Sequence, residues 1–113
     1  MRVPDSFIAE IHDFKETNIF LDLNGKADYE NAFEILCKAV EKVVKETGLK
    51  ITENNKGDYR LQVEINPVSS VEIQLLVLKM PGEKDQICID FNQLGECDKK
   101  TLLDVHAKVR DCL

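Results

Sequence analysis

The chain contains no tryptophan, and its aromatic residues are limited to five phenylalanines and two tyrosines. A hydrophobic core must therefore be built mainly from aliphatic side chains. The five glycines are isolated from one another, which excludes the glycine-rich loops that hold phosphate groups in nucleotide-binding proteins. No apolar run approaches the roughly 18–20 residues of a membrane-spanning helix, and the first residues lack the apolar core of a secretion signal. We therefore expect neither a phosphate-binding loop nor a membrane segment.

Acidic side chains outnumber basic ones by 21 to 15, which gives a net charge of −6. Nucleic acids and anionic membranes attract clustered lysine and arginine, and a negatively charged protein is repelled by both at long range. We therefore expect neither of them as a partner. With 113 residues, of which 43% are hydrophobic and 32% charged, the chain has the size and composition of one soluble globular domain spanning residues 1–113.

The four cysteines, Cys37, Cys88, Cys97 and Cys112, form no Cys-x-x-Cys pair. Two of them fall within regular elements at positions that we expect to face the interior. That pattern is typical of buried free thiols in a reducing compartment. The sequence therefore predicts a cytoplasmic or nuclear location.

Catalytic groups are sparse, because the chain has only two histidines, His12 and His106. A nucleophilic thiol needs a base within hydrogen-bonding distance, yet His106 and Cys112 would lie about 9 Å apart along a helix. A zinc site made from Cys88, Cys97, His106 and Cys112 would lack the short ligand spacings usual for zinc. We therefore expect no metal site, no cofactor and no enzymatic activity. A reactive Cys97 is the alternative that would make the protein a thiol enzyme.

Two amphipathic helices are predicted by apolar residues that recur at three- and four-residue spacing. The first runs from Tyr29 to Thr47, with Asp28 as its N-cap and Gly48 as the glycine that ends it. The second follows Asp98, its expected N-cap, and continues to the end of the chain. The apolar stripe of the first helix comprises Phe33, Leu36, Cys37, Val40, Val43 and Val44, and that of the second Leu102, Val105, Val109, Cys112 and Leu113.

Alternation of apolar and polar side chains predicts strands on both sides of the first helix. Turns rich in Asn, Asp, Gly and Pro separate several of them, and residues 7–14 fit either a short helix or an edge strand. The expected strands are 18–23, 49–52, 59–65, 71–80 and 86–91, and the expected turns are 53–58, 66–70 and 81–85. Short connections favour antiparallel neighbours. The sequence thus predicts an α+β fold, in which two helices pack on one face of a curled antiparallel sheet of four to five strands.

The sheet face that the helices leave uncovered is the expected partner-binding surface. Seven residues are expected on it: Arg60, Gln62, Glu64, Glu72, Gln74, Leu76 and Leu78. Residues 75–78 are apolar on both faces of their strand, which a strand buried on one side does not require. Either another segment of the chain or another protein must then cover the second face, and a homo-oligomer is one such arrangement.

The order of these elements is similar to a known family. The strand 18–23, an amphipathic helix, a meander ending in Ile87-Cys88-Ile89-Asp90-Phe91 and a terminal helix resemble the kinase-associated C-terminal domain of Ser/Thr kinases. The step Ile89-Asp90-Phe91, followed by a loop with Gly95 and Asp98, is the closest local match. The resemblance covers residues 18–113. It implies a non-catalytic regulatory domain that docks a protein partner, either a kinase domain or a scaffold subunit.

A second resemblance starts from Gly48-Leu49-Lys50-Ile51, which is followed by the strand 59–65 and by Asn66-Pro67. This part is similar to the RWD domains of kinetochore and ubiquitin-pathway proteins, which are also docking modules. A further alternative is an anionic-phospholipid-binding module, an activity found in members of the first family that carry basic clusters. The acidic character of this chain departs from that pattern.

Overall fold

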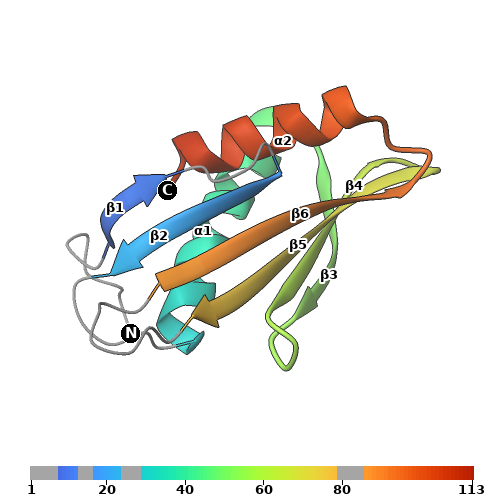
Figure 1. The fold of residues 1–113 in the computed structure, drawn as a ribbon. Helices are drawn as coiled ribbons and strands as arrows, with labels where there is room; N and C mark the ends of the chain where they lie inside the picture. The colour runs from blue at the N-terminus through green and yellow to red at the C-terminus, as the bar shows by residue number, and fades with distance from the viewer. Residues whose placement is uncertain (1–7, 13–16, 24–28, 79–85) are drawn as a thin grey trace.

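The computed structural model describes residues 8–12, 17–23, 29–78 and 86–113 (Figure 1). Within these residues the elements are β1 (Ile8–His12), β2 (Asn18–Leu23), α1 (Tyr29–Thr47), β3 (Lys50–Asn55), β4 (Arg60–Asn66), β5 (Ser69–Leu78), β6 (Gln86–Gly95) and α2 (Lys99–Asp111). The strands form one antiparallel sheet in the order β1-β2-β6-β5-β4-β3. The predicted α+β fold is confirmed. The described part of the sheet has six strands, because the ambiguous N-terminal segment contributes a strand.

Both helices cover the same face of this sheet. The strand register aligns Ile19 of β2 with Ile89 of β6, and Ile89 with Leu75 of β5. These three side chains are at most 1% exposed, and they belong to one cluster with the buried residues of α1 and α2. Fully burying a side chain of this size contributes roughly 1.5–3 kcal/mol before chain entropy is subtracted. The core is therefore a two-layer arrangement of helices on a sheet, and the other sheet face remains outside it.

The first helix has the predicted bounds. Gly48 follows its last residue with a φ of +75°, and the Gly48 N–H donates to the carbonyl oxygen of Val44 at 2.9 Å. A left-handed glycine at this position satisfies a terminal carbonyl and stops the helix. The buried side of α1 consists of Ala32, Phe33, Leu36, Ala39, Val40 and Val43. Cys37 and Val44 of the predicted stripe are only partly buried, and the expected cap Asp28 lies outside the described residues.

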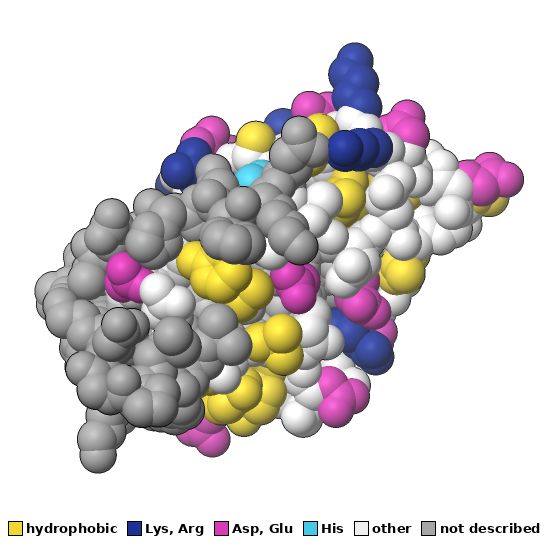
Figure 2. All heavy atoms as spheres, in the orientation of Figure 1, with side chains coloured by type: hydrophobic (Ala, Val, Ile, Leu, Met, Phe, Trp, Pro, Cys, Tyr) yellow, Lys and Arg dark blue, Asp and Glu magenta, His cyan; other side chains and the backbone are white. Residues whose placement is uncertain are grey.

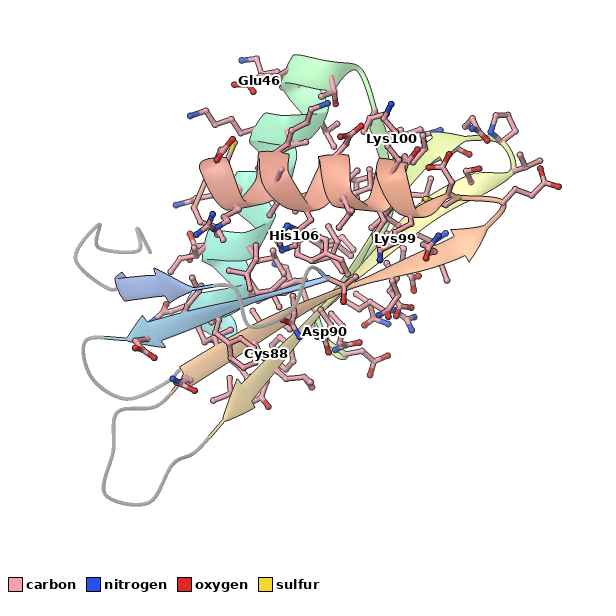
Figure 3. The ribbon with its side chains drawn as sticks, turned by 45° about the horizontal axis from the view of Figure 1, so that its top comes forward. Glu46, Cys88, Asp90, Lys99, Lys100 and His106 are labelled. Carbon is pink, nitrogen blue, oxygen red and sulfur yellow. The ribbon has the colours of Figure 1, made fainter. Side chains whose placement is uncertain are left out.

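The second helix begins after Asp98, as predicted, because its Oδ1 atom accepts a hydrogen bond from the Thr101 N–H at 2.8 Å. His106, which the predicted stripe omits, is only 8% exposed. Its Nε2 atom lies 3.0 Å from the Asn18 carbonyl oxygen, and its ring packs edge-on against Phe91 at 5.1 Å. A carbonyl oxygen can only accept, so Nε2 carries the proton. His106 thus connects α2 with the beginning of β2 (Figure 3).

Three strand boundaries differ from the sequence prediction by two residues or more. The sequence predicts a turn over 53–58, but Glu53, Asn54 and Asn55 pair with β4, which leaves only 56–59 for the turn. Pairing with a neighbouring strand outweighs the turn preference of these residues. Similarly, β5 begins at Ser69 and β6 continues to Gly95 because these two residues pair with each other. The predicted strand end at 79–80 and the turn 81–85 lie outside the described residues.

None of the helices within the described residues is both long and apolar enough to cross a membrane.

Candidate functional site

The predicted contact residues lie on the outer face of the sheet, opposite the helices. Arg60 pairs with Gln74, and Gln62 pairs with Glu72. Each of these side chains is half-buried, and so is Glu64, which pairs with Ser70. The register therefore brings these predicted residues together on two neighbouring strands. The backbone of Leu78 pairs with Gln86, but its side chain is not among those that the structure describes.

An apolar row crosses the outer face and consists of Phe20, Cys88 and Leu76, on β2, β6 and β5. Phe20 pairs with Cys88, and Cys88 pairs with Leu76. Cys88 is 6% exposed, whereas Leu76 is 42% exposed. Figure 2 shows hydrophobic side chains grouped with acidic ones on the face toward the viewer. Of these three residues, the sequence predicts only Leu76 as a contact residue. Phe20 and Cys88 lie next to it only because the strands are ordered β2-β6-β5 in the sheet.

The apolar row adjoins a carboxylate. The Cys88 thiol donates to Oδ1 of Asp90, two residues along β6, at 3.6 Å (Figure 3). Burial raises the pKa of Cys88 to about 12, and the Asp90 carboxylate contributes to this rise. The thiol is therefore protonated at neutral pH, and it serves as a small apolar residue with a weak donor.

The other buried thiol, Cys97, is also held in the protonated form. Burial raises the pKa of Cys97, and the Asp98 carboxylate adds to the rise. His106, the one histidine on α2, places its Nε2 atom on a backbone carbonyl. Within the described residues, no group of three or more His, Cys, Asp or Glu side chains is placed to hold a metal ion. The zinc set of Cys88, Cys97, His106 and Cys112 does not assemble.

The alternation of apolar and polar residues in β4 predicts that Arg60 contacts a partner, but in the structure Arg60 contacts two glutamates of this chain. Its guanidinium contacts Glu53 of β3 at 3.0 Å and Glu72 of β5 at 3.7 Å. The Nε atom is buried and has no hydrogen-bond partner. Arg60 therefore joins three adjacent strands across the outer face, so its charge is already matched within the chain.

A groove of about 690 Å³ lies on the other side of β3, between this strand and α1. Its α1 wall is one helix face, and its other wall is formed by the end of β3 and the following turn. The α1 residues are Glu30, Phe33, Glu34, Cys37, Lys38 and Glu41, and those of the other wall are Asn54, Lys56 and Tyr59. This volume is typical of a ligand or peptide site. The sequence does not predict this groove, because β3 comes to lie beside α1 only in the folded structure.

Two residues shape the ends of the groove. The Asn54 amide nitrogen lies 3.8 Å from the Cys37 sulfur, which holds the inner side of β3 against α1. Tyr59 has a φ of +53°, a left-handed conformation that is unfavourable for a residue with a bulky side chain. Its ring packs against Tyr29 at 4.6 Å and against Phe33 at 5.7 Å, and its carbonyl accepts from the Leu75 N–H at 3.0 Å. These contacts fix the strained backbone.

The sequence matches no model of a known protein family, and no curated protein matches it significantly. The resemblances to the kinase-associated C-terminal domain and to RWD domains therefore stay predictions. The protein has two candidate functional surfaces within the described residues, the outer face with its apolar row and the groove between α1 and β3.

Proposed function

We propose that the protein is a non-catalytic regulatory domain that binds another protein through the outer face of its sheet. The observation that carries this proposal is Leu76, which is 42% exposed in the middle of a sheet face. The inner face already provides the core, so folding does not require a leucine at this position. A partner that covers Leu76 would remove its apolar surface from water, which is favourable by roughly 25 cal/mol per Å² buried.

The surroundings of Leu76 have the composition of a protein interface. Phe20 and Cys88 extend the apolar row, and the polar pair Gln74–Asp90 lies directly beside Leu76 and Cys88. Gln62 and Glu64 pair with Glu72 and Ser70, farther along β5. Protein interfaces typically combine an apolar centre with a polar, water-accessible rim. The raised pKa values of Cys88 and Cys97 also support binding in preference to thiol chemistry, because a thiol is nucleophilic only as the thiolate.

The resemblance to the kinase-associated C-terminal domain suggests the kind of partner. In this proposal the partner is a kinase domain or a scaffold subunit, and binding shifts it between two states by a coupling of about 1–3 kcal/mol. The order of helix, antiparallel strands and terminal helix agrees with that family and equally with RWD domains. The RWD alternative would place the same docking surface in a kinetochore or ubiquitin-pathway complex. We propose a cytoplasmic or nuclear location on the basis of the free thiols.

Leu76→Glu tests the proposed surface, and Val68→Glu is its matched control. Val68 lies in the turn between β4 and β5 and is 55% exposed. The Val68→Glu substitution therefore also replaces an exposed apolar side chain with a carboxylate. Proteins captured from a cytosolic extract would be identified by mass spectrometry for the wild type and both variants. We expect Leu76→Glu, but not Val68→Glu, to lose the bound partner while both keep the urea midpoint of the wild type. Equal capture by all three proteins would refute the outer face as the docking surface.

Phospholipid binding is separated from this proposal by flotation with acidic vesicles. Lys99 and Lys100 of α2 are exposed, but the exposed acidic residues Asp98 and Asp104 flank them in the sequence, so the basic surface is short. Electrostatic binding to vesicles would weaken as salt is added. We expect no salt-sensitive flotation. Flotation that disappears at high salt would favour the lipid alternative.

A further inference from the structure

The outer edge of β3 is an unused strand edge. β3 is the last strand of the sheet and pairs with β4 alone among the described strands. An edge strand presents backbone N–H and C=O groups that have no partner in the sheet, and these groups can accept a further strand. The edge is also held in place, because Asn54 contacts α1 on one face and Glu53 is paired with Arg60 on the other.

The groove beside this edge can receive the side chains of an added strand. Phe33 and Tyr59 supply ring surface to its walls, and Cys37 lies one turn after Phe33 on α1. In strand addition, the backbone hydrogen bonds provide affinity, and alternate side chains enter a neighbouring pocket and provide specificity. The volume of about 690 Å³ accommodates side chains of this kind.

The charges around the groove indicate which segment fits. Three glutamates and two lysines line it, and one of these lysines, Lys38, is already paired with Glu34 at 3.3 Å. Glu34 and Glu41 are near enough to Cys37 to add to the rise of its pKa, which burial chiefly causes. The α1 wall therefore presents carboxylates to the groove, and the whole chain carries a net charge of −6.

We propose that an extended, basic segment of a partner protein adds to this edge of β3 and directs lysine or arginine side chains toward Glu41 and toward Glu34, whose carboxylate it would share with Lys38. This is a second interaction surface, separate from the outer face proposed above. A second copy of the chain fits less well, since it has the same acidic wall.

Short random peptides displayed on phage provide the probe. Peptides selected on the folded wild-type protein would be synthesised, and their dissociation constants measured at low and high salt. We expect enrichment of lysine and arginine at alternate positions and weaker binding at high salt. Because two attractive charge pairs become repulsive, Glu34→Lys combined with Glu41→Lys should weaken binding about tenfold. Glu46→Lys, a charge reversal at an exposed position of α1 away from the groove, should leave binding within about twofold.

Amide hydrogen exchange reports strand addition directly and does not depend on the variants. Bound peptide should slow the exchange of the backbone amides in 50–55. The Leu76→Glu variant should bind the peptide with the affinity of the wild type, which separates this site from the outer face. Failure to enrich basic peptides, indifference to the double charge reversal, or unchanged β3 exchange would each overturn the proposal. A dimer in sedimentation experiments whose β3 amides are protected without peptide would also overturn it, because a second copy would then occupy the edge.

Discussion

Gly95→Ala and Gly48→Ala form a matched pair that tests how the β4–β5 turn is packed. Both glycines have positive φ values, +65° and +75°. A side chain at such a φ costs about 1 kcal/mol in either position. The surroundings differ: a Cβ atom on Gly48 meets nothing within 4 Å, whereas a Cβ atom on Gly95 would lie 2.2 Å from the carbonyl oxygen of Val68.

The overlap at Gly95 cannot be relieved by rotating a side chain, because the obstructing atom belongs to the backbone. Val68 is held by two hydrogen bonds: its N–H donates to Oδ1 of Asn66 at 3.0 Å, and its carbonyl accepts from the Glu96 N–H at 2.7 Å. Moving the turn away would break the second bond, at about 1 kcal/mol, and displace the backbone, at about 1–3 kcal/mol. With the φ contribution, Gly95→Ala should lower the free energy of unfolding by about 3–5 kcal/mol.

Urea unfolding followed by far-ultraviolet circular dichroism measures both variants. If the slope is about 1.5 kcal/mol per molar urea, the midpoint of Gly95→Ala falls by at least about 2 M, and that of Gly48→Ala by less than about 1 M. Similar losses in the two variants would show that the turn yields to the added Cβ atom and that the reasoning about Val68 is wrong.

Three further predictions concern titratable side chains. The hydrogen bonds from Thr101 lower the pKa of Asp98, so the stability gained from this cap is present above the unfolded-state pKa of about 4. It is lost as the pH falls through the lower folded-state value, and Asp98→Asn should remove this dependence in acid-unfolding curves. Because the pKa of Cys88 is raised to about 12, iodoacetamide at pH 8 should leave Cys88 unmodified in the native protein and modify it after denaturation; modification at the rate of a free thiol would contradict this. His106→Ala should lower the free energy of unfolding by about 2–3 kcal/mol, measured in urea against the exposed control Lys108→Ala, and equal midpoints would show that His106 is not a core residue.

The local sequence contains enough information to predict the helices and the alternating strands. Helix bounds depend on neighbouring residues such as Gly48 and Asp98, and the burial of β4 follows from strict alternation. The ends of β3 and β6 are harder to predict, because residues with turn preference enter a strand when a partner strand supplies hydrogen bonds. Nothing in 18–23 indicates that β2 pairs with β6, which lies far along the chain.

The candidate sites differ in the same way. Leu76 is conspicuous in the sequence because its strand is apolar on both faces, and the structure leaves it exposed. Phe20 and Cys88 join it only through the strand order. The groove depends on the packing of α1 against β3, two elements whose contact no local pattern specifies. Sequence reasoning therefore finds surfaces made by one strand and misses those that several elements share.

Arg60 shows how the two surfaces are related. Its alternation places it on the outer face, where a partner would be expected to use its charge, but Glu53 and Glu72 already match that charge. Removing the guanidinium would therefore take away this side-chain link on the outer face, leaving β3 held by its backbone pairing with β4 and by the inner contact between Asn54 and Cys37. A strand that is ordered before binding does not lose conformational freedom when a partner adds to it, which increases affinity. We therefore propose that Arg60 favours binding at the groove by ordering the edge of β3, whereas the proposed binding at the outer face depends on the apolar row.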